Sequence, residues 1–135
     1  MTPKELEIKY KNGLLKTKGG TFWFCGAYPF GKAGDNFYKL ENIEFNQELN
    51  FLKVTTEHGI AKIINPSGII EEKKGYGGYR FGVNCDKIIF ENSWNTELNE
   101  VEYYVQNGNA YSKHSNGYTQ EKRPFEPYSI FEFGE

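Results

Sequence analysis

The chain has few of the residues from which covalent or metal-centred sites are usually built. Only two cysteines occur, Cys25 and Cys85, and they stand sixty positions apart. The two histidines are equally isolated, and no C-x-x-C or H-x-x-x-H spacing exists. A disulfide scaffold and a zinc site are therefore not expected, and both thiols are interpreted as buried residues in a reducing compartment. We expect no metal, no cofactor and no catalytic residue set.

The chain also lacks an excess of charge of one sign and any long apolar run. Its formal net charge is −2 and its sequence pI is about 5.8, so no basic field favours nucleic acid or an anionic membrane. Residues 1–6 contain no apolar targeting segment, and no apolar run reaches the roughly 20 residues of a membrane span. The sequence predicts a cytoplasmic protein without a membrane partner.

Aromatic residues and glycine are abundant, with 11 Phe, 10 Tyr and 2 Trp beside 15 Gly. Aromatic side chains fit pleated, half-buried surfaces, and glycine supplies the reversals between strands. Residues 2–5 resemble a capping box and favour a short helix over residues 3–11, although alternation in this stretch also fits a strand. We therefore predict a single all-β domain over residues 1–135, an antiparallel barrel or sandwich of about nine or ten short strands, with a small α contribution at the N-terminus.

Turn residues and alternation locate several strands. Residues 37–45 change phase near Glu41-Asn42, which indicates a β-bulge. Residues 49–56 and 60–65 flank a three-residue hairpin loop, 57–59, that ends in glycine. Asn-Gly pairs at 107–108 and 116–117 predict a three-stranded meander from about residue 100 to 121. Residues 129–133 are predicted to form a last strand.

The loop after the apolar segment 22–25 is the first candidate site. Loops on a rigid β scaffold often carry binding residues, so this loop could hold polar groups at the mouth of a pocket. The residues concerned are Trp23 and Phe30 as the floor and Lys32, Asp35 and Asn36 at the mouth. The Asp-Asn pair can also form an Asx turn, which requires no function.

The segment 74–81, Lys-Gly-Tyr-Gly-Gly-Tyr-Arg-Phe, is the second candidate site. It resembles the RNP1 motif of RNA-recognition and cold-shock domains, which begins with a basic residue, glycine, an aromatic residue and a small residue. The resemblance implies that rings such as Tyr76 stack on the bases of a single strand, with Tyr79 and Arg80 in the same segment. Gly78 departs from the motif, because an aromatic residue is expected there. A Gly-rich reversal into a strand accounts for the same residues.

Aromatic residues between positions 94 and 118 are the third candidate site. Together with Tyr76–Phe81, they provide more rings than a core of this size needs. The residues concerned are Trp94, Tyr103, Tyr104, Tyr111 and Tyr118, with Glu100, Glu102 and Glu121 as an acidic fringe. An exposed tyrosine cluster with an acidic fringe is typical of a protein-binding face.

These observations favour a non-catalytic binding module that uses a Tyr/Trp-rich face against a macromolecular partner. A small acidic protein of this kind could neutralise or regulate a basic protein, such as a toxin or nuclease, as immunity proteins do. A small-ligand or carbohydrate-binding barrel, with a cavity lined by Phe22, Trp23, Phe24 and Trp94, is the alternative. Single-stranded nucleic-acid binding through residues 74–81 comes third. An enzyme using Glu or Cys–His chemistry would need those groups to converge in one cleft.

Overall fold

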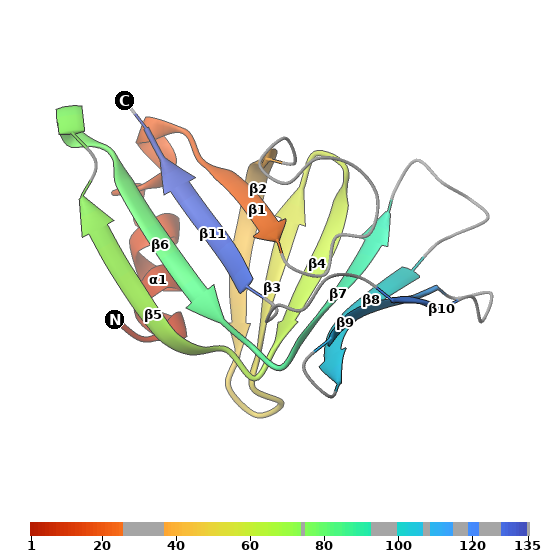
Figure 1. Cartoon of the computed structure of the whole chain (residues 1–135). Helices are drawn as coiled ribbons and strands as arrows, with labels where there is room; N and C mark the ends of the chain where they lie inside the picture. The colour runs from red at the N-terminus through yellow and green to blue at the C-terminus, as the bar shows by residue number, and fades with distance from the viewer. Residues whose placement is uncertain are drawn as a thin grey trace.

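The computed structural model describes residues 1–25, 37–73, 75–92, 100–106, 109–114, 119–121 and 128–134. These residues form one α-helix, two short 3₁₀ turns and eleven strands (Figure 1). The helical elements are α1 (Pro3–Lys11), η1 (Lys16–Lys18) and η2 (Gly75–Gly77). The strands are β1 (Thr21–Cys25), β2 (Phe37–Asn46), β3 (Phe51–Thr56), β4 (Gly59–Ile64), β5 (Ser67–Lys73), β6 (Tyr79–Asn84), β7 (Lys87–Asn92), β8 (Glu100–Gln106), β9 (Asn109–His114), β10 (Thr119–Glu121) and β11 (Tyr128–Phe133).

Helix α1 begins and ends where the sequence predicts. The side chain of Thr2 accepts a hydrogen bond from the Glu5 N–H (3.2 Å), and Pro3 occupies the first turn, where a missing N–H is tolerated. The helix ends at Lys11, and Gly13 just beyond it has a φ of 83°, which favours glycine. The expected small α contribution at the N-terminus is therefore confirmed.

All strands belong to one sheet in which every neighbouring pair is antiparallel. The order is β10-β9-β8-β7-β4-β3-β2-β1-β11-β6-β5. Its two ends, β10 and β5, are not paired with each other, so the sheet is open. The predicted all-β antiparallel architecture is confirmed. The described residues form eleven strands, one more than the upper limit of the nine or ten that the sequence predicts.

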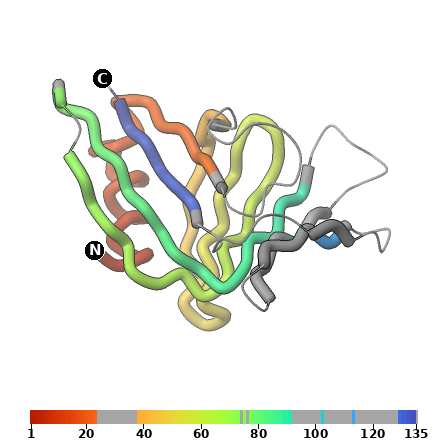
Figure 2. The backbone as a smooth tube through the Cα atoms, in the orientation of Figure 1, coloured from red at the N-terminus to blue at the C-terminus, as the bar shows by residue number. Residues whose placement is uncertain are grey.

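A bent two-stranded ribbon gives the sheet its shape. Strand β4 continues into β5, and β6 continues into β7; β4 pairs with β7 while β5 pairs with β6. Figure 2 shows both traces bending at the same level. At the bend, Asn65 has a φ of 51° and its side-chain amide donates to Asp86 Oδ2 (2.7 Å). Strands that change direction in this way form the corners of curled sheets.

The core lies on the face of the sheet that α1 covers. Four of the described phenylalanines are fully buried there, namely Phe22, Phe81, Phe131 and Phe133. Phe22 and Phe131 have ring centroids 5.2 Å apart, and the ring of Tyr10 on α1 lies 6.2 Å from that of Phe133. Within the described residues, no helix is long and apolar enough to cross a membrane.

Local predictions of the strands are mostly accurate. The register of β2 against β3 shifts between Leu40 and Asn42, where the phase change indicated a bulge. Strands β8, β9 and β10 pair as the predicted meander, and β11 covers the predicted last strand. The hairpin loop between β3 and β4 is shorter than predicted, because Gly59 pairs with Thr56 and leaves two residues in the loop.

Candidate binding face

The cross-strand register brings together residues that are far apart in the sequence. Residues directly opposite each other in an antiparallel sheet lie on the same face and interact as pairs. One row of opposed residues runs across β3, β4, β7, β8 and β9: Phe51, Ile64, Lys87, Tyr104 and Tyr111. The next row on the same face consists of Lys53, Lys62, Ile89, Glu102 and Lys113. We call these ten positions the outer face.

The outer face is turned away from the core. Leu52, Val54, Ile63 and Ile88 alternate with its residues along β3, β4 and β7, and all four are fully buried. The described apolar residues of the outer face are instead half-buried, including Ile64 and Ile89. The half-buried apolar side chains offer contact area to a second surface, whereas the four lysines and one glutamate give the face an excess of positive charge.

Charged side chains of the outer face make specific contacts with their neighbours. Lys87 Nζ lies 2.9 Å from Glu102 Oε1, so these two groups form an ion pair between β7 and β8. Lys62 Nζ lies 5.6 Å from the centroid of the Phe51 ring, a cation–π distance. Beyond these pairs, Glu91 stands directly opposite Glu100 at one end of the face. Like charges in this position repel each other.

Among the described residues, two of the predicted binding residues are brought together on this face. Tyr104 and Tyr111 are opposed in the β8–β9 hairpin, at outer-face positions. Tyr103 occupies a position of the other face, opposite the buried Ile88. The register therefore divides the adjacent tyrosines of β8 between the two faces.

The predicted residues of the RNP1-like segment are found at the other end of the sheet. Tyr79 is half-buried and stacks in parallel with the buried Phe81, with centroids 6.4 Å apart and an angle of 11°. Arg80 Nε lies 3.5 Å from Glu132 Oε1 on β11. Tyr76 belongs to the short turn η2. The rings of Tyr79 and Phe81 are thus engaged in packing.

The predicted pocket residues lie on opposite faces of β1 or outside the described chain. Phe22 is part of the core, whereas Trp23 faces the other way, opposite Ile130. The indole nitrogen of Trp23 is shielded from solvent. Phe30, Lys32, Asp35, Asn36 and Trp94 lie outside the described residues. A cavity shared by Phe22, Trp23, Phe24 and Trp94 stays a prediction.

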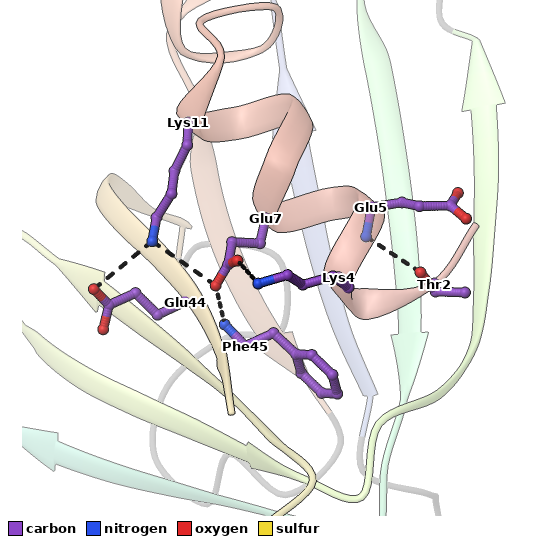
Figure 3. Close-up of polar contacts among 7 residues, drawn as sticks. All are labelled: Thr2, Lys4, Glu5, Glu7, Lys11, Glu44 and Phe45. Atoms are coloured by element: carbon purple, nitrogen blue, oxygen red, sulfur yellow. Dashed lines mark hydrogen bonds and ion pairs between the residues drawn. The ribbon is translucent and has the colours of Figure 1, made fainter. Parts of the chain in front are cut away.

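A groove of about 370 Å³ borders the outer face where β2 and β3 meet α1. Its central carboxylate, Glu7, is almost fully buried and accepts hydrogen bonds from Lys4 Nζ (2.7 Å) and from the Phe45 N–H (2.5 Å), as Figure 3 shows. Lys11 Nζ lies between Glu7 (3.8 Å) and Glu44 (3.9 Å). Burial alone would raise the pKa of Glu7, but the contacts with Lys4, Phe45 and Lys11 outweigh it and lower the pKa. Glu7 is therefore an ionised structural group.

Sequence reasoning missed Phe51, Ile64, Lys87 and Ile89 as members of the outer face. Each stands in an alternating stretch, but alternation does not tell which strand becomes the neighbour of which. In the described residues, no three His, Cys, Asp or Glu side chains are grouped so that they could hold a metal ion. Comparisons with protein-family models, with curated proteins and with solved structures found no match to this chain.

Proposed function

We propose that this chain is a non-catalytic binding module whose outer face contacts another protein. The observation that carries the proposal is the register that opposes Tyr104 and Tyr111 beside Lys87, in one row with Ile64 and Phe51. Tyrosine offers a large contact area at low cost in side-chain entropy, and it is enriched among residues that dominate binding energy. A row of this kind on a five-stranded face provides a stiff surface for such contacts.

The outer face itself carries four lysines and one glutamate, so the support for a basic partner comes from the acidic positions beside it and from the net charge of the chain. Glu91 and Glu100 occupy directly opposed positions of β7 and β8, an arrangement that is generally unfavourable for like charges. A lysine or arginine of the partner placed between these positions would offset the like charge on binding. The net charge of −2 would also favour encounter with a basic protein. Neutralisation of a basic protein, such as a nuclease or toxin, is the role that we propose.

The test begins with affinity purification of a stoichiometric partner from the native host. It is followed by titration calorimetry with the purified partner. The double variant Tyr104→Ala/Tyr111→Ala should weaken binding by at least a hundredfold, since truncation of central aromatic residues costs about 2 kcal/mol or more each. Tyr104→Phe/Tyr111→Phe keeps both rings and should lose less.

Lys39→Ala is the matched surface control, because Lys39 is exposed on β2 and has no ion pair in the described part of the chain. This variant should bind the partner like the unmodified protein. The proposal fails if no stoichiometric partner is recovered. It also fails if the partner is not basic, or if the double alanine variant binds it unchanged.

A further inference from the structure

A second groove lies at the other end of the sheet, between the C-terminal end of α1 and the β5–β6 hairpin. Its volume is about 330 Å³. Lys9, Leu14 and Lys18 line it from the helical side, and Glu71, Lys73 and Tyr79 line it from the hairpin. Figure 1 shows α1 running behind β5 and β6. We call this site the β5 groove; it shares no residue with the outer face.

Strand β5 borders the β5 groove and is the last strand of the sheet. It pairs with β6 only, so in the described chain its other edge offers backbone N–H and C=O groups without a neighbouring strand. Six of its seven residues are exposed, and Ile70 leaves 59% of its surface accessible. An open edge of this length is a template on which an extended segment can be added.

The two faces of β5 differ in chemistry. Glu71 and Lys73 are opposite Phe81 and Tyr79, so they lie on the groove side of the sheet. Ile70 is opposite Gly82 on the reverse side. A strand added beside β5 would therefore present every second side chain to the groove and the others to Ile70.

The β5 groove carries an excess of positive charge, although the whole chain is slightly acidic. Lys18 is held in place: its Nζ donates to the Gly77 carbonyl (3.3 Å) and lies 6.0 Å from the centroid of the Tyr79 ring. Lys9 and Lys73 form no ion pair in the described part of the chain, and Glu71 is the one acidic residue of the lining. Three ammonium groups around one carboxylate are complementary to an acidic segment.

We propose that β5 binds an extended acidic segment of another protein by strand addition. The segment places a carboxylate opposite Lys73, within reach of the groove lysines, and a β-branched apolar residue opposite Ile70. These two positions are three residues apart, so their side chains point to opposite faces of the added strand. The recognised pattern is thus an acidic residue and Val or Ile at a spacing of three.

A second copy of this chain that pairs antiparallel with β5 does not meet these requirements. A two-fold antiparallel pairing that opposes Ile70 with itself places Ser67 of the second copy opposite Lys73. A pairing that opposes Glu72 with Lys73 places Gly75 opposite Ile70, and Gly75 belongs to the turn η2. Opposing Glu71 with Lys73 instead places Lys74 opposite Ile70. None of these antiparallel registers supplies both contacts, whereas a separate acidic segment can supply both.

The experiment uses the full chain to select binders from a displayed library of random peptides about eight residues long. We expect enrichment of peptides that contain Asp or Glu three positions from Val or Ile. The enriched peptide, made synthetically, should bind about tenfold more weakly to Lys73→Glu and more weakly when its own acid is replaced by the amide. Lys73→Ala is the milder second variant, and Lys39→Glu, on neither surface, should stay within twofold.

Amide hydrogen exchange distinguishes strand addition from simple charge attraction. On peptide binding, alternate amides of residues 70–73 should become protected, because the added strand accepts their hydrogen bonds. The proposal is overturned if no peptide is enriched, if enriched peptides lack the acid, or if β5 amides stay unprotected. Self-association of the chain through β5 would overturn it as well. Tyr104→Ala/Tyr111→Ala should leave peptide binding unchanged, so this result is independent of the proposed function.

Discussion

Removal of the Glu7 carboxylate should loosen the attachment of α1 to β2. In Glu7→Ala, the Phe45 N–H loses its acceptor, and an unsatisfied buried donor costs about 1–3 kcal/mol. The ion pair with the half-exposed Lys4 adds about 0.2–1 kcal/mol. We therefore expect the free energy of unfolding to fall by about 1–4 kcal/mol, measured by urea denaturation. For a chain of this length, Tm should fall by about 3–12 °C.

Glu7→Gln separates the hydrogen bond from the charge. The amide oxygen of Gln can still accept from the Phe45 N–H, but it cannot form ion pairs with Lys4 and Lys11. The expected loss is therefore smaller, about 1 kcal/mol at neutral pH. Glu48→Gln is the matched control, since Glu48 is exposed in the turn between β2 and β3 and should change stability by less than about 0.5 kcal/mol.

The dependence of stability on pH provides an independent test of whether the charge of Glu7 stabilises the folded protein. Because the pKa of Glu7 is lowered in the folded protein, its stabilising contribution is present above the pKa of the unfolded chain. It is lost as the pH falls through the lowered value of the folded state. The stability difference between the unmodified protein and Glu7→Gln should therefore be full at neutral pH and shrink under acid conditions. A difference that is the same at all pH values would refute the reasoning, as would a Glu7→Ala variant as stable as the control Glu48→Gln.

Three further predictions concern the backbone and one buried hydroxyl. Gly20→Ala should cost about 1–3 kcal/mol in urea denaturation, because an added Cβ would lie 2.6 Å from the ring of Phe133. Asn65→Ala should cost about 1–2 kcal/mol, because the left-handed backbone at the bend and the hydrogen bond to Asp86 both favour Asn. Burial, with a smaller effect of Glu41, raises the pKa of Tyr10, so the stability that Tyr10 contributes over Tyr10→Phe should decline as pH rises above about 10.

Each of these predictions has an internal check. Gly134→Ala should be neutral, because a Cβ there meets no atom within 4 Å; equal losses at both glycines would contradict the packing argument. Asn65→Gly should lose less than Asn65→Ala, and the reverse order would exclude backbone strain as the cause. For Tyr10, a stability difference that grows in alkali would contradict the raised pKa.

Short-range signals predicted the parts of the fold that depend on a few neighbouring residues. Three such features are the cap at Thr2, the bulge after Leu40 and the β8–β10 meander. Each follows from the conformational preferences of a few neighbouring residues, and the folded structure keeps those preferences. The pairing of β1 with β11 could not be predicted in this way, because these strands are about a hundred residues apart. Alternation is the same whichever strand lies alongside, so it does not specify distant neighbours.

The candidate site follows the same rule. Neighbouring residues of a strand occupy opposite faces, so Tyr103 and Tyr104 of β8 are separated, and the β8–β9 register places Tyr111 opposite Tyr104. Phe51 and Ile64 join them only through pairings of β3, β4 and β7, which no local signal indicates. No local sequence pattern predicted the β5 groove either, since its lysines belong to three separate elements.

The exposure of the apolar side chains shows what much of the aromatic excess is for. Among the described side chains, the large apolar residues that are most exposed are aliphatic: Ile8, Leu14, Leu49 and Ile70. The described rings are buried or half-buried, so much of the aromatic excess serves packing. Two of the four exposed aliphatic residues, Leu14 and Ile70, lie at the β5 groove or on its strand. The exposed apolar side chains therefore indicate a binding surface at the edge strand β5 more directly than the aromatic excess does.

The two proposed surfaces differ in position, and this leads to a last prediction. Glu91 and Glu100 suit a basic partner, whereas Lys9, Lys18 and Lys73 suit an acidic segment. The outer face extends towards β10, at the opposite end of the strand order from β5, so neither ligand should block the other. A peptide bound at the β5 groove should leave the affinity of the outer-face partner unchanged within about twofold in calorimetry. Competition between the two would mean that they share one site, and the division of the sheet into two binding surfaces would then be wrong.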